Sequence, residues 1–296
     1  MSATLIQVER LAGDLVYPEG PSILGDGRVA FTQVNISTLS VWDSDQGVQT
    51  IADTGGGPNG SCLGAGGELY IAQNRGIVGD WRADRVMAGS IQRVTAAGDV
   101  EALVTEVDGI ELLQPNDLAF GPDGRLYFTD PGYFDLATRP DPGRIFVLNA
   151  DGTGELLVEL EATYPNGIVV RPDGTVVWAE SYTSRVCERA PDGGVSVLAE
   201  LSRPNAVPDG MALAADGTLY VAVLFAGGID MISPEGEELG ALDVGRINSN
   251  CAFDGSQLYV TDFFTDPLDS TVTPAGVLWR ATLETEGLEA FTGSLS

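Results

Sequence analysis

Short runs of apolar and aromatic residues alternate with small polar turns along the whole chain. In the clearest copies, an apolar run leads into an Asp-Gly turn and then a second run rich in Tyr, Val and Phe; these copies span 118–129, 168–179 and 211–222. Weaker copies surround Asp26-Gly27, Gly66-Gly67 and Asp254-Gly255. Such a pattern predicts β-hairpins. The chain therefore contains six related hairpins.

Further β-type runs at 89–94, 143–148 and 275–280 leave room for four strands in each repeat. Dividing 296 residues by six gives about 49 residues per repeat, near the period of propeller blades. The pattern predicts an all-β fold, a six-bladed β-propeller, with residues 1–296 as a single domain. The run at 4–10 precedes the first repeat, and we expect it to be the outer strand that closes the last blade.

Aligning the six repeats by their turns places an oxygen-bearing side chain at the start of every first strand. The six residues are Glu19, Asn59, Asn116, Asn166, Asp209 and Ser249, and the first five each follow a proline. The innermost strands of a propeller line its central channel, so these side chains are expected to form a ring. The alternative is that Pro-Asn-Gly and Pro-Asp-Gly are only turn-forming sequences.

A ring of carboxylate and amide oxygens predicts a site for one divalent metal ion. Glu19 and Asp209 would supply two negative charges, and without a cation they would repel one another in a narrow channel. Oxygen-only ligands suit hard cations. Ca²⁺ is the expected ion, and Mg²⁺, Mn²⁺, Zn²⁺ and Fe²⁺ are the other candidates.

Composition removes several classes of function. The chain has 15 Lys+Arg against 43 Asp+Glu, a formal net charge of -28, which argues against a nucleic-acid partner because such partners require a basic surface. The absence of His excludes the Ser-His-Asp triad, the Cys-His pair and the usual zinc ligand set.

No apolar run is long enough to span a membrane, and residues 1–10 do not form a secretory signal. A cytoplasmic protein with no membrane partner is therefore expected. The three cysteines, Cys62, Cys187 and Cys251, match no zinc or redox motif, and we interpret them as buried thiols.

Five segments resemble blade motifs of the senescence marker protein, gluconolactonase and luciferin-regenerating enzyme family. They are 17–21, 114–118, 164–168, 207–211 and 249–253. The resemblance implies a calcium-dependent propeller lactonase whose cation is bound by Glu19, Asn166 and Asp209. It also implies that Asn116 lies beside the metal, where it contacts substrate or completes the coordination. Gln114 stands where several family lactonases have an Arg that holds a sugar acid, so a less polar substrate is expected.

Together, these features predict a metal-dependent hydrolase that opens a small lactone or ester. The metal would polarise the carbonyl and stabilise the developing oxyanion. Without His, the base must be a carboxylate or metal-activated water, and Asp209 is the preferred base, with Glu19 as a pure ligand. Three loops, 73–87, 131–142 and 263–274, are expected to build the substrate mouth, and Tyr133 is a candidate substrate contact.

Other functions fit the same residues. A phosphotriesterase similar to diisopropyl fluorophosphatase would use a nearly identical ligand set, and a lyase or isomerase could use the cation to stabilise an enolate. A non-enzymatic propeller with a structural metal is the remaining alternative.

Overall fold

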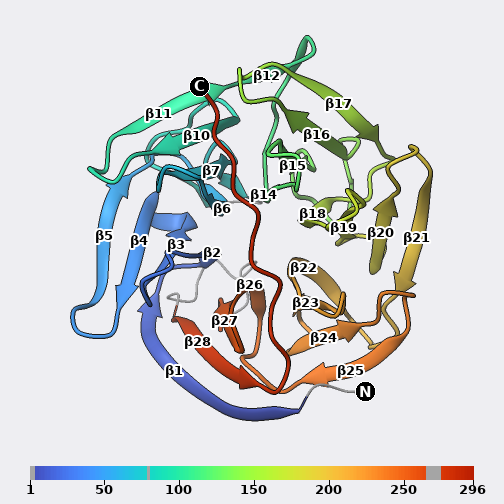
Figure 1. The fold of residues 1–296 in the computed structure, drawn as a ribbon. Coiled ribbons are helices and arrows are strands. Elements are labelled where there is room, and N and C mark those ends of the chain that lie inside the picture. The colour runs from blue at the N-terminus through green and yellow to red at the C-terminus, as the bar shows by residue number, and fades with distance from the viewer. Residues whose placement is uncertain (1–3, 79–80, 265–274) are drawn as a thin grey trace.

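Six antiparallel four-stranded sheets surround a central axis in the computed structural model (Figure 1). The structure describes residues 4–78, 81–264 and 275–296. In each of the first five blades, the strands follow one another in sequence from the axis outward. The predicted all-β, six-bladed propeller is confirmed.

The blades share this inner-to-outer order. The first is β2 (Pro18–Ile23), β3 (Val29–Gln33), β4 (Thr38–Asp43) and β5 (Gly47–Asp53); the second is β6 (Pro58–Leu63), β7 (Leu69–Gln73), β10 (Ser90–Val94) and β11 (Val100–Val104); the third is β14 (Leu118–Phe120), β15 (Leu126–Asp130), β16 (Arg144–Leu148) and β17 (Gly154–Glu159). The fourth is β18 (Pro165–Val170), β19 (Val176–Glu180), β20 (Arg185–Arg189) and β21 (Val195–Glu200); the fifth is β22 (Val207–Leu213), β23 (Leu219–Leu224), β24 (Ile229–Ile232) and β25 (Glu238–Leu242); the sixth is β26 (Asn248–Asp254), β27 (Gln257–Asp262), β28 (Gly276–Leu283) and β1 (Leu5–Leu15).

Two small hairpins and one helical turn lie outside the blades. The hairpins are β8 (Ile77–Val78) with β9 (Trp81–Arg82), and β12 (Glu106–Val107) with β13 (Ile110–Glu111); the turn is the 3₁₀ helix η1 (Val34–Ile36). Among the described residues, no helix has the length and apolar character needed to cross a membrane.

The apolar core lies between neighbouring blades. Every residue of β23 is buried, whereas the outer strand β21 is largely exposed. Between the third and fourth blades, Tyr127 and Ile145 pack against Ile168 and Trp178. Middle strands are covered on both faces by adjacent blades, which explains why their sequences read as nearly continuous apolar runs.

The N-terminal strand closes the ring. β1 pairs antiparallel with β28 and becomes the outer strand of the sixth blade, as the sequence predicted (Figure 1). Closure in this way joins the two ends of the described chain in one sheet and covers the edge of β28, which would otherwise present unpaired backbone groups.

Deleting the residues up to Ala12 should therefore destabilise the protein and promote aggregation. We expect the melting temperature to fall by roughly 5–10 °C and light scattering to rise with protein concentration, because the edge of β28 becomes available for pairing. As a control, Glu9→Ala removes only the exposed ion pair with Arg280 and should cost less than about 1 kcal/mol. A truncated protein that melts with the full chain would contradict this role of β1.

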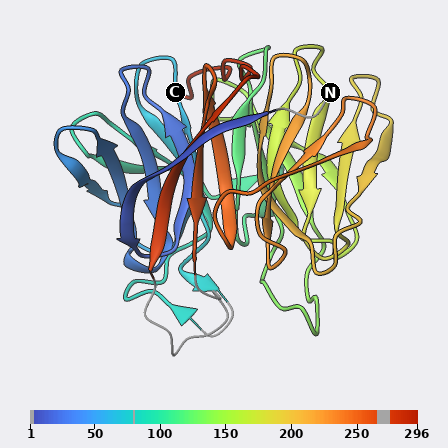
Figure 2. The same ribbon diagram turned by 90° about the horizontal axis from the view of Figure 1, so that it is seen from below.

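A C-terminal strap, residues 284–296, crosses one end of the channel (Figure 1). The Leu288 amide donates to the Leu213 carbonyl at 2.9 Å, the Ala65 amide to the Gly293 carbonyl at 2.8 Å, and the Ser296 amide to the Ala150 carbonyl at 2.7 Å. The strap thus joins the fifth blade to the second and third. The β8–β9 hairpin projects from the opposite face (Figure 2), which we call the loop face.

Candidate metal centre at the propeller axis

The inner strands are irregular at the positions where the sequence predicts the ring. Register shifts fall between Glu19 and Ser22 in β2, and at the equivalent places in β6, β18, β22 and β26. A β-bulge bends its strand and redirects a side chain. The Pro-Asn-Gly and Pro-Asp-Gly segments therefore lie in bulged strands, and the interpretation of them as simple turns is wrong.

Glycine follows the ring residue because neighbouring inner strands touch at the axis. A Cβ atom on Gly20 would lie 2.4 Å from the Ser61 nitrogen, and one on Gly167 would lie 2.4 Å from the Asp209 carbonyl oxygen. Gly20 also has a φ of +45°, a region that favours glycine. Adjacent blades can bring their ring residues together only because these positions lack a side chain.

Hydroxyl groups connect each ring segment to a neighbouring blade. The Thr32, Thr129 and Ser181 hydroxyls donate to the carbonyls of Asn59, Asn166 and Pro208 at 2.7, 2.8 and 2.7 Å. The Ser249 hydroxyl donates to the Pro18 carbonyl at 2.8 Å, which links the sixth blade to the first. These bonds hold the bulged backbone in place around the axis.

Carboxylates at the ends of second strands fix the chain that leads into the ring. The buried Asp130 accepts the Leu113 and Gln114 amides, both at 2.7 Å. Asp262 accepts the amides of Arg246 and Ile247 in the same way, at 3.0 and 2.8 Å. Each ring residue therefore begins its strand from a hydrogen-bonded approach segment.

The structure brings Glu19, Asn166 and Asp209 together at the axis. All three are buried, with 3, 6 and 4% of their surface exposed. The Asn166 amide hydrogen-bonds to the Asp209 carboxylate and donates to the Ser181 hydroxyl at 3.1 Å. Asn116 is equally buried, and its amide bonds to the Tyr164 hydroxyl. Asn116 directly precedes β14 and aligns with the strand through its own amide, which donates to Thr129.

The electrostatics of this cluster are those of a carboxylate group that lacks a counter-charge. Burial raises the pKa of Glu19 to about 8, with a further contribution from the Asp117 charge, although the Gly20 amide opposes the shift. Burial, followed by the charges of Glu19 and Asp117, raises the pKa of Asp209 well above its usual value. No ion pair among the described residues involves any of these three carboxylates.

A divalent cation fits this donor set. Carboxylate and amide oxygens are the ligands that hard cations prefer, and a cation would offset the charge that burial disfavours. Within the part of the chain that the structure describes, no three His, Cys, Asp or Glu side chains could hold a metal by themselves. Amide oxygens from residues such as Asn166 would therefore have to take part.

Sequence reasoning missed two polar residues beside the ring, Asp117 and Asn250. They occupy the position after the ring residue, where the first, second, fourth and fifth blades have glycine. Asp117 and Asn250 are 6 and 5% exposed, and burial raises the pKa of Asp117 to about 6. The signal was available as two breaks in the glycine pattern.

Other predicted residues have varied surroundings. Asn59 is only half-buried, and Ser249 is fully buried with its hydroxyl committed to Pro18. Gln114 is 2% exposed and donates its amide to the Ile77 carbonyl of β8. Tyr133 is half-buried and lies under the Arg75 guanidinium, 6.0 Å from the ring centre. Most of the predicted mouth loop 263–274 lies outside the described residues.

Aromatic side chains gather around the segments that lead into the ring. Tyr17 packs edge-on against Phe263, with ring centres 5.3 Å apart, and Trp81 and Phe225 pack on the same cluster. Tyr164 lies 5.0 Å from both Phe134 and Tyr182. Since Tyr17 and Tyr164 each stand two residues before a ring residue, the loop-face approach to the axis is largely aromatic.

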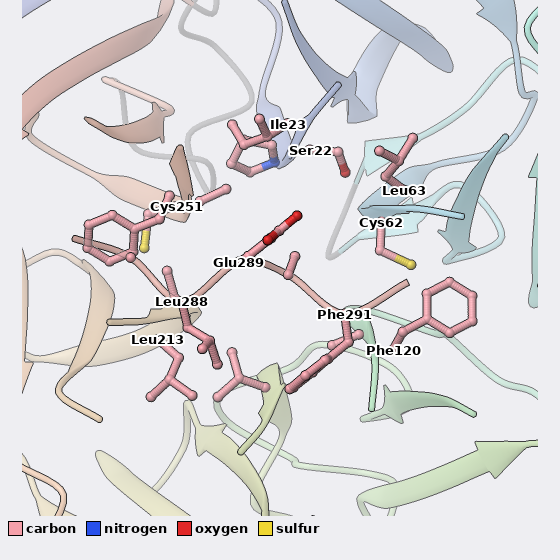
Figure 3. A pocket seen from close by; sticks show the side chains of 18 of the residues that line it. Ser22, Ile23, Cys62, Leu63, Phe120, Leu213, Cys251, Leu288, Glu289 and Phe291 are labelled. Atoms are coloured by element: carbon pink, nitrogen blue, oxygen red, sulfur yellow. The ribbon is translucent and has the colours of Figure 1, made fainter. Parts of the chain in front are cut away.

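A cavity of about 620 Å³ lies on the strap side of the ring (Figure 3). Its walls are mainly apolar, with Ile23, Leu63, Phe120, Leu213 and Phe291 among the lining residues. Asp117 and Asn250 line it as well, whereas Glu19, Asn166 and Asp209 do not. The ring and the cavity therefore share only the two residues that sequence reasoning missed.

Comparisons with known proteins agree with this architecture. A gluconolactonase from Zymomonas mobilis is 26% identical over 299 residues, covering 86% of this chain and 78% of the relative. A solved luciferin-regenerating enzyme has a TM-score of 0.80 at 20% identity and covers 98% of this chain and 99% of its own. Regucalcin from Agrobacterium tumefaciens, a calcium-binding protein, has a TM-score of 0.73 at 18% identity, covering 100% and 97%.

The predicted family resemblance extends beyond single motifs. The family model for the SMP-30/Gluconolactonase/LRE-like region matches residues 17–263, from the first ring segment to the end of the inner hairpin of the sixth blade. Because that match covers most of the chain and includes all six ring positions, the chain belongs to the SMP-30/gluconolactonase/LRE-like family.

Proposed function

We propose that the protein is a divalent-metal-dependent lactonase whose active centre is the ring at the propeller axis. The observation that carries the proposal is the meeting of Glu19 and Asp209 in a buried site without a basic partner among the described residues. Membership of a family that includes gluconolactonases supports lactones as the substrate class. Ca²⁺ is the proposed ion, in keeping with the calcium-binding relative.

Glu19, Asn166 and Asp209 would hold the cation, with Asn116 beside it. When bound, the cation would supply Lewis-acid polarisation of the lactone carbonyl. Asp209 accepts the proton of the attacking water at a carboxylate oxygen, while the Asn166 amide orients that carboxylate. Glu19 contributes charge and remains a ligand. The Tyr164 hydroxyl fixes the Asn116 amide, which then contacts the substrate.

The substrate is a lactone or ester of low polarity that carries no negative charge. The net charge of -28 opposes the approach of anions, and the aromatic clusters at the loop face favour an apolar body. Gln114 already donates to the Ile77 carbonyl, so we place it as the support of the mouth hairpin as well as a neighbour of the substrate. Tyr133 would contact substrate from the loop that carries it.

A reloading experiment tests the proposal. Chelated protein is supplied separately with Ca²⁺, Mg²⁺, Mn²⁺, Zn²⁺ or Fe²⁺ and assayed on aliphatic and aromatic lactones, on an anionic sugar-acid lactone and on a phosphotriester. We expect turnover of uncharged lactones to disappear on chelation and to return with at least one cation.

The products distinguish the alternatives. Opening of the lactone to the hydroxy acid supports the proposal, whereas an unsaturated or isomerised product would replace it with a lyase or isomerase. Preference for the phosphotriester would make the protein a phosphotriesterase. Undiminished turnover in the chelated protein would refute metal dependence, and absence of turnover with every substrate and metal would favour a structural cation.

A further inference from the structure

The six positions that follow the ring residues form a second level around the axis. Four of them are glycine, and the other two are Asp117 in the third blade and Asn250 in the sixth. In a ring of six, these blades lie opposite one another (Figure 1). The Asn250 amide donates to the Asp117 carboxylate across the axis, with 3.3 Å between Nδ2 and Oδ2.

Glycines make room for this contact. A Cβ atom on Gly60 would lie 2.2 Å from Asp117 Oδ1, and one on Gly210 would lie 2.0 Å from Asn250 Cγ. Each polar side chain therefore occupies the space that the preceding blade leaves open. We call the hydrogen-bonded pair of Asp117 and Asn250 the axial bridge.

Backbone amides fix the orientation of both side chains. The Cys251 amide donates to Asn250 Oδ1 at 2.8 Å, so the Asn250 NH₂ group must point the other way. That group hydrogen-bonds to Asp117 and also to the Glu19 carboxylate. The Leu118 amide donates to Asp117 Oδ1 at 2.9 Å and fixes the second partner. Glu19 is thus oriented by the axial bridge and by the Gly20 amide, which donates to Oε2 at 2.9 Å.

We propose that Asp117 and Asn250 are a positioning pair that forms the floor of the metal centre. Asn250 holds Glu19 in the orientation that a cation requires, and Asp117 holds Asn250 and adds a third carboxylate whose charge favours a cation. The bridge also separates the ring from the strap-side cavity that both residues line. This inference rests on the proposed metal centre, since it assigns the residues that support its ligands.

The test measures Ca²⁺ affinity by competition with a chelating dye, independently of lactone turnover. Asp117→Ala and Asn250→Ala should each weaken Ca²⁺ binding by about 10-fold or more, within the range known for partners of metal ligands. Because each residue acts through the other, the double variant should lose much less than the product of the two single losses. Asp117→Asn keeps an acceptor oxygen for Asn250 and Leu118, and should recover part of the affinity lost in Asp117→Ala.

Leu213→Ala is the matched control. Leu213 lines the same cavity and is buried, but it does not belong to the bridge. This variant should lower the melting temperature and leave the Ca²⁺ dissociation constant unchanged. If it weakens Ca²⁺ binding as much as the bridge variants do, general loosening of the channel explains the effect and the positioning role is refuted.

Two further outcomes separate this inference from the proposed function. Normal Ca²⁺ binding and lactone turnover in both single alanine variants would overturn the bridge and leave the lactonase intact. Weaker Ca²⁺ binding in the variants of a protein that turns over no lactone would support the bridge while the lactonase fails. A wild-type protein that binds no divalent cation would overturn both.

Discussion

Asp209→Asn should abolish lactone turnover without unfolding the protein. The change removes the proposed base and one of the two negative charges that balance the cation, so we expect kcat to fall by about 10³-fold or more together with a loss of Ca²⁺ affinity. Asparagine has the same shape, and its carbonyl oxygen can still accept the hydrogen bond that Asn166 gives to Asp209. The measurement is steady-state turnover beside a direct Ca²⁺ titration.

The stability of the same variant should change in the opposite direction. In chelated protein, Glu19, Asp117 and Asp209 repel one another, so removal of one charge relieves that repulsion. Chelated Asp209→Asn should therefore melt at or above the temperature of chelated wild type. Asp216→Asn is the control: Asp216 belongs to an exposed turn of the same blade, where it accepts the Thr218 amide at 3.0 Å, and turnover should be unaffected. Wild-type turnover in Asp209→Asn would refute the proposed role.

The stabilisation that Ca²⁺ gives should grow as the pH rises. Burial raises the pKa of Glu19 from 4.5 to about 8 and that of Asp117 from 3.8 to about 6, and it raises the pKa of Asp209 as well. The folded chelated protein therefore binds more protons than the unfolded chain above about pH 4. The stability from these groups is fully present below the unfolded pKa values and is lost as the pH rises towards 8.

Melting temperatures with chelator and with excess Ca²⁺, at about pH 5, 6.5 and 8, measure this effect. With bound Ca²⁺ the carboxylates can ionise in place, so the difference between the two conditions should widen with pH and reach on the order of 5–10 °C at the highest value. Repulsion from the net charge of -28 acts in both conditions and cancels in the difference. In Asp209→Asn the difference should be smaller. A difference that stays constant or narrows with pH would contradict the carboxylate cluster as the origin.

Much of the candidate site could be predicted because the repeat is local. Each inner hairpin has its own Asp-Gly or Gly-Gly turn, so alignment by the turn alone placed Glu19, Asn166 and Asp209 in one register. The structure has the same register, with a bulge at the ring position of five inner strands. The turn-forming alternative was wrong because a single motif does not reveal that its glycine faces the backbone of another blade.

Gln114 shows where the sequence is insufficient. Its place in the motif indicates substrate contact, but the fold also buries it and bonds its amide to the Ile77 carbonyl, 37 residues away. The partner lies in a hairpin between the middle strands of another blade, and no periodic signal connects the two. Contacts of this kind depend on how loops of different blades fold over the same face.

The sequence by itself determined the six-bladed architecture, the closure by the N-terminal strand and the register of the ring, because each depends on short patterns that repeat along the chain. The tertiary structure decided which side chains meet across the axis. Asp117 and Asn250 are 133 residues apart, and they touch because closure of six blades places the third opposite the sixth. The strap across one end of the channel is likewise a consequence of closure, since its hydrogen bonds reach blades that are distant in sequence.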